Sequence, residues 1–235
     1  MLRQALRAAI VDLDGTMVNT LGDFHVALNR SLSDLDLPAV DAALVERTVG
    51  KGSEHLILSV LQHQMALPGV QACPSSTPLT AADPLYEAAW QRYQHHYLAI
   101  NGQFANVYPG VVEGLQMMRD DGLALACLTN KPLAFARQLL RDKGLDGFFM
   151  QVFGGDSFEC KKPDPLPVLK TCEALGALPA HTLMLGDSSN DAQAAHAAGC
   201  PVVLVRYGYN HGQPVDQVPA NAHWDRFTQW REWKA

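Results

Sequence analysis

The chain has 235 residues, and its 18 basic and 24 acidic side chains give a formal net charge of −6. Hydrophobic residues make up 48% of the sequence, enough for a sizeable core in one or two domains. Charged residues are 18%, which excludes a disordered acidic chain. The negative balance and the scattered basic residues exclude a surface that binds nucleic acid through its phosphates.

The most apolar stretches are short. Ala8–Val11 and Val202–Val205 have the length of a strand and are too short to span a membrane. Asp12 and Asp14 interrupt the first apolar run before it could form the core of a signal peptide. We therefore expect a soluble, cytoplasmic protein without membrane or nucleic-acid partners. Five cysteines without a Cys-x-x-Cys pair predict reduced thiols rather than disulfides or a zinc site. They are Cys73, Cys127, Cys160, Cys172 and Cys200.

Strand-length apolar runs alternate with helix-patterned stretches along the chain. The predicted strands, each buried on both faces, are Ala8–Val11, Leu123–Leu128, Met150–Phe153, Thr182–Leu185 and Val202–Val205. The predicted helices between them are Gly110–Asp121, Leu133–Lys143, Leu166–Leu175 and Asp191–Ala198. This alternation predicts an α/β fold with a parallel sheet and right-handed crossovers.

One long interval shows only helix patterns and no convincing strand. It runs from Leu21 to about Val107 and contains Leu21–Leu35, Asp41–Val49, Ser53–Met65 and Leu85–Ile100. A stretch rich in proline and serine, from Pro68 to Pro84, is interpreted as a long loop. We predict a helical cap domain at residues 21–107, inserted into an α/β core formed by residues 1–20 and 108–235.

Two carboxylates follow the first predicted strand. Residues two apart in an extended segment face the same way, so Asp12 and Asp14 can converge while Leu13 points into the core. Carboxylates this close repel each other unless a cation or a shared proton lies between them. Gly15 allows a tight turn and is expected to leave its backbone N–H open to an anion. The alternative is an ordinary solvated acidic loop.

Two further polar segments follow later along the chain. Thr129 and Asn130 come directly after Leu123–Leu128, where they could bind phosphoryl oxygens, cap the next helix, or do both. Lys161 and Lys162 lie in a loop stiffened by prolines. We expect one of the two, and Lys162 before Lys161, to offset the charge of a transferring phosphoryl group. The alternative is that both are solvated surface lysines.

A fourth polar segment follows the predicted strand Thr182–Leu185. It consists of Gly186, Asp187, Ser188, Ser189, Asn190 and Asp191. Its two carboxylates suit Mg²⁺, and the run holds more polar groups than helix capping needs. Ligands of open parallel sheets bind beyond the carboxyl ends of the strands, so the polar segments are expected to meet at one edge. The sequence therefore predicts a phosphoryl-transfer site.

In this order the motifs resemble those of the haloacid dehalogenase superfamily over nearly the whole chain. They are Asp12-x-Asp14-Gly-Thr, Thr129, Lys162-Pro and Gly-Asp187-x-x-x-Asp191. The likeness is greatest to the bacterial phosphoglycolate phosphatases. It implies a Rossmann-like core with a C1-type helical cap. It also implies Mg²⁺-dependent hydrolysis of a small phosphorylated metabolite, 2-phosphoglycolate, by a monomer or homodimer.

The resemblance also implies residue roles. Asp12 would attack phosphorus and become an aspartyl-phosphate, Asp14 would serve as acid and base, and Thr129 and Lys162 complete the catalytic group. The implied metal ligands are Asp12, the main chain of Asp14, Asp187 and, directly or through water, Asp191. The implied substrate-binding residues are Gly15, Thr16, Lys51, Gly52, Thr129 and Asn130. Asn19 stands where the superfamily usually has Asp, and we interpret it as a helix-entry residue.

Selectivity is expected to come from the cap. Glycines surround Lys51, which predicts a loop tip that dips into the site. We hypothesise that Lys51 or the adjacent N–H groups meet the substrate carboxylate; an ordinary exposed lysine is the alternative. A separate aromatic cluster near the C-terminus is expected to pack in the core or at a dimer contact. It comprises Trp224, Phe227, Trp230 and Trp233.

Other functions fit parts of the pattern. A phospho-accepting receiver module also has acidic residues, Thr and Lys at strand ends, but it lacks a helical cap and is about half this length. A haloacid dehalogenase would have no use for Asp14, since its leaving group needs no proton. A β-phosphoglucomutase would have a histidine in the first cap helix, where His25 is one position out of register. Other small phosphate esters remain open as substrates.

Overall fold

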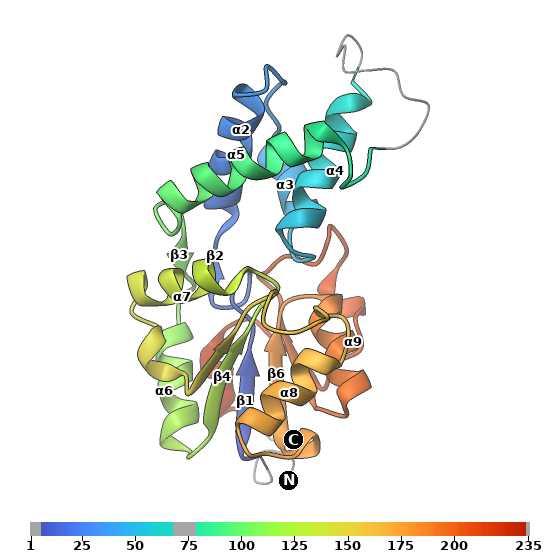
Figure 1. The fold of residues 1–235 in the computed structure, drawn as a ribbon. Helices are drawn as coiled ribbons and strands as arrows, with labels where there is room; N and C mark the ends of the chain where they lie inside the picture. The colour runs from blue at the N-terminus through green and yellow to red at the C-terminus, as the bar shows by residue number, and fades with distance from the viewer. Residues whose placement is uncertain (1–5, 68–78, 234–235) are drawn as a thin grey trace.

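The computed structural model describes residues 6–67 and 79–233. Its centre is a parallel six-stranded sheet in the order β5-β4-β1-β6-β7-β8 (Figure 1). The strands are β1 (Ala8–Val11), β4 (Ala124–Leu128), β5 (Gln151–Phe153), β6 (Thr182–Gly186), β7 (Val202–Val205) and β8 (Ala222–Trp224). Strand β1 pairs with both β4 and β6, since Ala8 lies opposite Ala124 and Thr182. The carboxyl ends of these three strands therefore lie side by side.

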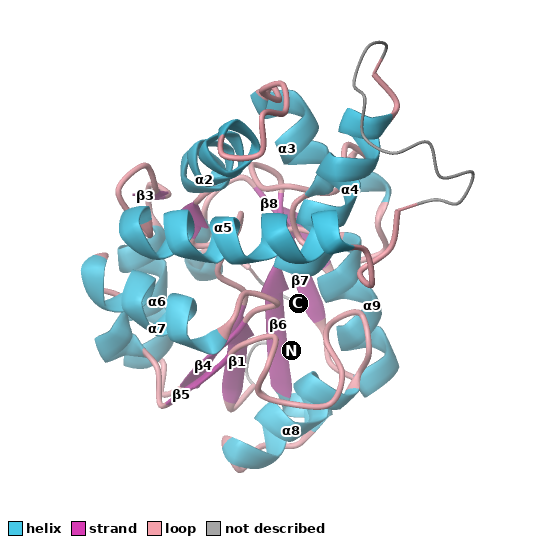
Figure 2. Ribbon diagram, turned by 45° about the horizontal axis from the view of Figure 1, so that its top comes forward, coloured by secondary structure: helices cyan, strands magenta, loops and turns pink. Residues whose placement is uncertain are grey.

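Four helices flank the sheet, as the alternation of patterns predicts (Figure 2). They are α6 (Val111–Asp120), α7 (Leu133–Asp142), α8 (Leu166–Ala174) and α9 (Ser189–Ala198). Short 3₁₀ turns lie at Asp146–Phe148, Pro179–His181, Val215–Gln217 and Phe227–Arg231. All five predicted strands and all four predicted core helices are confirmed to within two residues at each end. The sixth strand, β8, was missed because its three residues include a histidine and form no apolar run.

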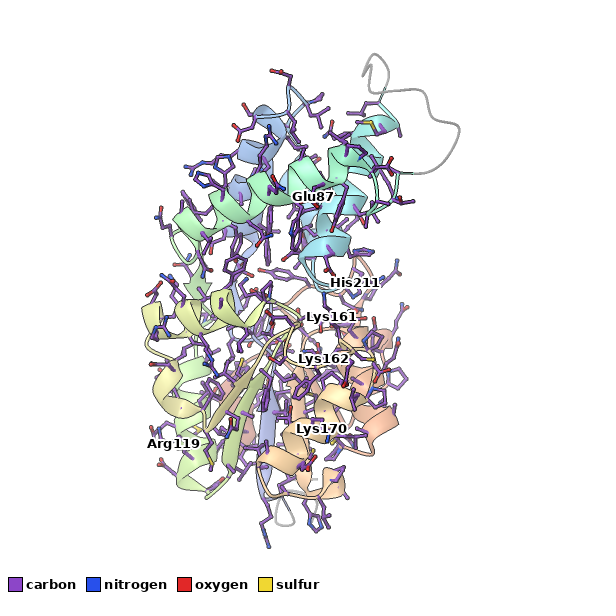
Figure 3. The ribbon with its side chains drawn as sticks, viewed as in Figure 1. Glu87, Arg119, Lys161, Lys162, Lys170 and His211 are labelled. Atoms are coloured by element: carbon purple, nitrogen blue, oxygen red, sulfur yellow. The ribbon has the colours of Figure 1, made fainter. Side chains whose placement is uncertain are left out.

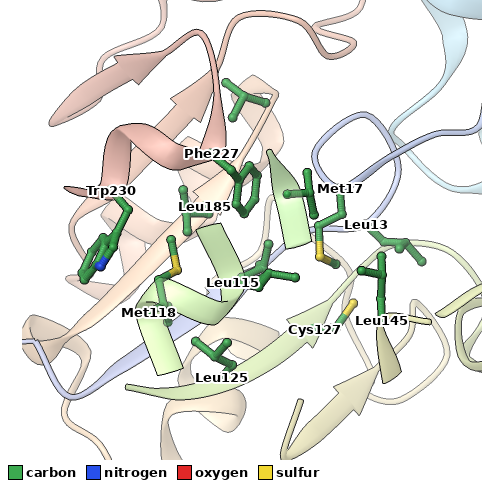
Figure 4. Packing of buried hydrophobic residues seen from close by; sticks show 14 of the residues in the cluster. Leu13, Met17, Leu115, Met118, Leu125, Cys127, Leu145, Leu185, Phe227 and Trp230 are labelled. Carbon is green, nitrogen blue, oxygen red and sulfur yellow. The ribbon is translucent and has the colours of Figure 1, made fainter. Parts of the chain in front are cut away.

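The side chains of β1 alternate between two apolar clusters, one on each face of the sheet. Ala9 and Val11 pack in the cluster that also contains α6, and Ile10 packs in the cluster beneath α8 and α9. Figure 4 shows the first cluster, with Leu115 and Phe227 near its centre. The four aromatic residues near the C-terminus belong to this cluster, so their predicted core packing is confirmed. They are Trp224, Phe227, Trp230 and Trp233.

The long interval between the first two core strands forms a separate helical layer above the carboxyl ends of the strands (Figure 1). Its helices are α2 (Leu21–Ser33), α3 (Ala42–Thr48), α4 (Ser53–Met65) and α5 (Pro84–Ile100). The layer has an apolar cluster largely its own, in which Tyr93 and Tyr97 of α5 stack at 5.4 Å between ring centroids. Because α2 and α5 lie side by side, the two ends of the interval leave the layer together.

Two short strands connect the helical layer to the sheet. Strands β2 (Val18–Asn19) and β3 (Asn106–Val107) pair antiparallel. The expectation that no strand lies between Leu21 and Val107 is therefore wrong at β3, because two residues are too few to give a periodic pattern. Asp23 of α2 reinforces the connection, since its buried carboxylate accepts hydrogen bonds from the backbone N–H groups of Gly102 and Phe104, both at 2.7 Å.

Some predictions fall on residues that the structure does not describe. Most of the predicted Pro68–Pro84 loop lies outside the described residues, as does Cys73, and Pro84 is the first residue of α5. The other four cysteines are free thiols, with the Sγ atoms of Cys172 and Cys200 3.8 Å apart. None of the described helices combines the length and the apolar character that crossing a membrane requires.

Candidate active site

A cavity lies between the carboxyl edge of the sheet and the helical layer. Its sheet side is lined by Asp12, Asp14, Thr129, Asn130, Lys131, Lys162, Asp187, Ser188, Asn190 and Asp191. Its helical side is lined by Phe24, Val49, Gly50, Gly52, Ser53 and Leu56. Figure 3 labels Lys161 and Lys162 at this junction. The convergence of the four predicted polar segments on one edge of the sheet is therefore what the structure shows.

Three buried carboxylates form the floor of the cavity. Asp12 follows β1, and Asp187 and Asp191 follow the neighbouring strand β6. One oxygen from each carboxylate lies within 4.8 Å of the others. The pairing of β1 with β6 brings them together from sequence positions about 175 residues apart, a distance that no local pattern specifies. Oxygen ligands at this spacing suit a hard divalent cation such as Mg²⁺.

Lys162 lies among these carboxylates with 2% of its side chain exposed. Its Nζ donates to Asp12 Oδ1 at 2.8 Å, to Asp191 Oδ1 at 2.7 Å and to the carbonyl oxygen of Leu128 at 2.9 Å. These three acceptors use the three hydrogens of the ammonium group. Lys161 instead pairs with Glu54 of α4 at 2.6 Å, outside the cavity. Of the two lysines considered, the structure brings Lys162 to the carboxylates.

The pKa values of these groups reflect their burial. Burial raises the pKa of Asp12 to about 7, although the Lys162 ammonium opposes the increase. Burial also raises the pKa of Asp187 well above its usual range, and the nearby carboxylates of Asp191 and Asp12 add to the increase. Burial would lower the pKa of Lys162, but Asp12 and Asp191 raise it above its usual value. When ionised, three carboxylates against one ammonium leave a negative charge that a cation would offset.

Asp191 holds several groups in place at once. While Oδ1 accepts from Lys162, Oδ2 accepts from the Oγ of Ser188 at 2.8 Å and from the backbone N–H groups of Asp187 and Ser188 at 3.2 Å. These bonds also cap the N-terminus of α9, so capping and site assembly use the same carboxylate. Asp191 therefore joins Lys162 to the first turn of α9.

The carboxylate of Asp14 lies outside the group of three and pairs with Lys131. Lys131 Nζ is 3.0 Å from Oδ1 and 3.3 Å from Oδ2. The same ammonium donates to the hydroxyl of Tyr97 and lies 4.6 Å from the ring centroid of Phe24. Asp14 and Asp12, two residues apart, thus face the same cavity with different cationic partners. The spacing argument for Asp12 and Asp14 predicted the shared cavity but not the separate partners.

Thr129 and Asn130 both line the cavity, but neither caps α7. The first backbone N–H of that helix, at Leu133, donates to Asp156 Oδ1 at 2.8 Å. Asn130 instead holds the next loop, since its Oδ1 accepts from Lys162 N at 3.0 Å and its Nδ2 donates to Lys162 O at 2.8 Å. The capping alternative is therefore wrong, and the side chain of Asn130 fixes the backbone of Lys162.

Gly15 and Thr16 are buried beside the carboxylates but do not line the cavity. The N–H of Gly15 donates to the carbonyl of Val18 at 2.9 Å, so the expectation that it is open to an anion is wrong. The hydroxyl of Thr16 donates to Asp187 Oδ1 at 3.3 Å. Gly15 has φ +82°, and a Cβ there would lie 2.1 Å from Asp187 Oδ2. Glycine therefore allows the loop after β1 to pack against Asp187.

The loop after α3 closes the cavity from the helical side. The carbonyl oxygen of Gly50 accepts from Asn130 Nδ2 at 3.2 Å and from Asn190 Nδ2 at 3.1 Å. Gly50 and Gly52 line the cavity, whereas the side chain of Lys51 between them is exposed and does not. The predicted loop tip is thus present at the site, but the structure does not bring the Lys51 ammonium to it.

Two other sequence interpretations concern α2. His25 contacts the carbonyl of Val40 and Asn29 Nδ2, both at 3.0 Å, and does not line the cavity. Its position gives no support to a β-phosphoglucomutase. Asn19 accepts from the backbone N–H of Leu21 at 3.2 Å, which agrees with a role at the entry to α2.

Sequence reasoning missed two residues of the site, Lys131 and Asn190. Lys131 directly follows Asn130, but a loop lysine is usually solvated and nothing local predicts its burial. The sequence distinguishes Asn190 only as a member of a polar run. Its contact with Gly50 joins segments 140 residues apart. Only the position of the helical layer, which the sequence does not specify locally, brings these partners together.

The comparisons with known proteins agree with this geometry. Residues 9–205 match the family described as haloacid dehalogenase-like hydrolase. A phosphoglycolate phosphatase from Thiobacillus denitrificans is 39% identical over 218 residues, which are 92% of this chain and 90% of that protein. One from Nitrosospira multiformis is 39% identical over 217 residues, with 92% and 90% covered. The crystal structure of a predicted phosphoglycolate phosphatase from Haemophilus somnus has a TM-score of 0.88 and 31% identity, with 97% of both chains covered. By sequence and by fold, the chain belongs to the haloacid dehalogenase-like hydrolases.

Proposed function

We propose that the protein is a Mg²⁺-dependent phosphomonoesterase that hydrolyses 2-phosphoglycolate to glycolate and phosphate through an aspartyl-phosphate on Asp12. Membership of the family and relatives named phosphoglycolate phosphatase support a phosphoric monoester hydrolase. The observation that carries the proposal is the cluster of Asp12, Asp187 and Asp191 around Lys162 at the floor of a cavity. It combines an oxygen-rich cation site with a nucleophile of suitable chemistry.

The residues present fit a magnesium ion. Asp12 and Asp187 would hold it. Asp191, whose Oδ atoms are engaged with Lys162 and Ser188, would help to orient these two ligands. A bound Mg²⁺ supplies charge neutralisation at the phosphoryl oxygens. Burial raises the pKa values of Asp12 and Asp187 and the neighbouring carboxylates add to the increase, so a bound cation would favour their ionised forms.

The reaction proceeds in two displacements. A carboxylate oxygen of Asp12 attacks phosphorus, the bond from phosphorus to the ester oxygen breaks, and Asp14 donates a proton to the leaving oxygen. Water then attacks the aspartyl-phosphate, its proton returns to Asp14, and phosphate leaves as Asp12 is regenerated. Lys162 stays within hydrogen-bond distance of Asp12, where its charge lowers the repulsion between nucleophile and phosphate.

Thr129 lines the sheet side of the cavity and is placed to contact the phosphoryl group, whereas Lys162, whose three hydrogens are engaged, acts through its charge. The Thr129 hydroxyl accepts from the backbone N–H of Lys131 at 3.2 Å, which leaves its own proton for an oxygen of the substrate. We assign residues 1–20 and 108–235 to the core and 21–107 to the cap. In this division the Gly50–Gly52 loop of the cap closes over the ester and excludes water.

The test is a screen of small phosphate esters ranked by kcat/KM. It includes 2-phosphoglycolate, ethyl phosphate, 3-phosphoglycerate and β-glucose 1-phosphate, each assayed with Mg²⁺ and again with excess EDTA. We expect 2-phosphoglycolate to rank first and its hydrolysis to stop in EDTA. If another ester has a tenfold higher kcat/KM, that ester and not 2-phosphoglycolate is the substrate. If β-glucose 1-phosphate is converted without phosphate release, the protein is a phosphotransferase and not a phosphatase.

A further inference from the structure

We propose that Lys131 recognises the anionic tail of the substrate, so that the enzyme selects phosphate esters whose leaving group carries a carboxylate beside the ester oxygen. The proposal rests on the proposed function, because it assigns the substrate class of the same site. It replaces the exposed Lys51 with a buried cation that lines the cavity.

The position of Lys131 is unusual for a loop lysine. Only 2% of its side chain is exposed, although it belongs to the connection between β4 and α7. The rings of Phe24 and Tyr97, from helices α2 and α5, lie 4.6 and 4.7 Å from its Nζ. The ammonium is thus held between the helical layer and the sheet edge. A buried charge is costly unless it is paired, and Asp14 is the acidic residue that pairs with it.

The pairing with Asp14 places Lys131 next to the leaving group. If Asp14 protonates the ester oxygen, that oxygen lies about 2.6–3.2 Å from the Asp14 carboxyl group. Lys131 Nζ lies 3.0 and 3.3 Å from the two oxygens of the same carboxyl group. In 2-phosphoglycolate the carboxylate carbon is only two bonds from the ester oxygen. Its oxygens are therefore within reach of the same ammonium.

The charges of the residues that line the cavity also indicate Lys131 as the partner of the substrate carboxylate. Four carboxylates line it, from Asp12, Asp14, Asp187 and Asp191, and they would repel a second anionic group on the substrate. Among the described lining residues the basic ones are Lys131 and Lys162. Lys162 is occupied by Asp12 and Asp191 at the floor. Lys131 is the cation next to Asp14, the residue that protonates the leaving oxygen, and there a carboxylate tail needs a partner.

The experiment compares two esters that differ only in the tail. Ethyl phosphate has a methyl group in place of the carboxylate of 2-phosphoglycolate. The ratio of their kcat/KM values is measured for the wild type, Lys131→Met, Lys131→Arg and, as a matched surface control, Lys170→Met. Lys170 lies on α8 with 51% of its side chain exposed, far from the junction (Figure 3).

We expect the wild type to favour 2-phosphoglycolate by tenfold or more. Lys131→Met should reduce this ratio at least tenfold, because a charged hydrogen-bond partner is lost inside a closed site. Lys131→Arg should keep most of the ratio, and Lys170→Met should keep all of it. Lys131→Gln, which retains a polar end, serves if thermal unfolding shows that Lys131→Met does not fold.

Two outcomes would overturn the proposal, and they are distinguishable. If Lys131→Met slows both esters by the same factor, the ratio is unchanged and Lys131 only positions Asp14, while the proposed function stands. If the wild type itself shows no preference for the carboxylate-bearing ester, 2-phosphoglycolate fails as the substrate and the role of Lys131 fails with it.

Discussion

The two sides of the cavity differ in the chemistry of the residues that line them. On the sheet side, charged groups hold one another, as when Lys162 bridges Asp12 and Asp191. On the helical side, the part of the lining that the structure describes carries no charged side chain and consists of apolar residues such as Phe24 and Leu56, the loop that contains Gly50, and Ser53. The sheet side fixes reacting groups by short charged contacts from neighbouring parallel strands, whereas the helical side shapes the space around the substrate.

The connections of the two sides differ in the same sense. The sheet edge is rigid because β1 is paired along its length with β4 and β6. The helical layer is joined to it by the two-residue strands β2 and β3 and by side-chain contacts, among them the hydrogen bonds of Gly50 and the contact of Lys131 with Tyr97. We infer that changes to Asp12 and Lys162 on the sheet side act on the chemical step. Changes to the helical side, or to the residues that contact it, such as Asn190 and Lys131, act on substrate binding. The predictions below test this division.

The largest effect is expected from Asp12→Asn. The amide has the shape of the carboxylate but is a poor nucleophile, so kcat should fall by at least about 10³-fold. Steady-state assays with 2-phosphoglycolate measure the loss, and circular dichroism with thermal unfolding checks that the fold persists. Turnover at the wild-type rate in a folded variant would exclude Asp12 as the nucleophile.

Lys162→Met should destabilise the protein as well as inactivate it. Removal of the ammonium leaves Asp12 and Asp191 without their shared cation in a buried place, which costs about 3–5 kcal/mol of unfolding free energy. Urea unfolding measures this difference, and Lys170→Met, in an exposed ion pair, is the control. If the two variants have the same free energy of unfolding, Lys162 does not stabilise the fold by balancing the charges of Asp12 and Asp191.

Much of the fold could be predicted because its pattern is local. Strands such as Val202–Val205 are continuous apolar runs, and helix α9 is followed by Gly199, which has φ +80°. Short elements could not be predicted in this way. Strand β3 has two residues and β8 has three, and both exist because of their partners rather than because of their own pattern.

In the candidate site too, residues with a local sequence signal could be predicted and residues placed by distant partners could not. Asp12, Asp187 and Lys162 could be predicted, because each follows a strand or lies in a loop at one edge of a parallel sheet. The environment of Lys131 could not be predicted, since its burial depends on rings from two helices of another layer. The hydrogen bond of the Gly15 N–H could not be predicted, because its acceptor is the carbonyl of Val18 in β2, a two-residue strand whose partner β3 is distant in the sequence.

Removal of the proposed Mg²⁺ should destabilise the sheet side of the cavity and leave the helical layer unchanged. A ligand that binds only the folded state at 100 times its Kd adds about 2.7 kcal/mol to the free energy of unfolding. The pKa of Asp12 is about 7, so protons compete with the cation below that pH. The stabilisation by Mg²⁺ over EDTA is therefore expected to be larger at pH 8 than at pH 6, as measured by thermal unfolding. Equal stabilisation at both pH values would show that Asp12 is not a ligand of the cation.

Asn190→Ala tests the contact between the two sides directly. It removes one of the two hydrogen bonds that Gly50 O accepts from the sheet edge and leaves that of Asn130. A net loss of about 0.5–1.5 kcal/mol should raise the KM for 2-phosphoglycolate by up to roughly tenfold with little change in kcat. Gln91→Ala, on the exposed face of α5, is the control. A fall in kcat at constant KM would place Asn190 with the chemical step.

The smallest effect is expected from Lys51→Ala. The side chain of Lys51 is exposed and does not line the cavity, although the backbone of its loop does. Exposed substitutions usually change free energies by less than about 0.5 kcal/mol, so the KM for 2-phosphoglycolate should stay within about twofold of the wild type. Compared with Lys131→Met in the same assay, this variant shows which of the two lysines binds the substrate carboxylate. A tenfold rise in KM for Lys51→Ala would show that the loop turns its lysine inward when substrate binds. In that case the helical side contributes a charge as well as a shape, and the division between the two sides fails at this loop.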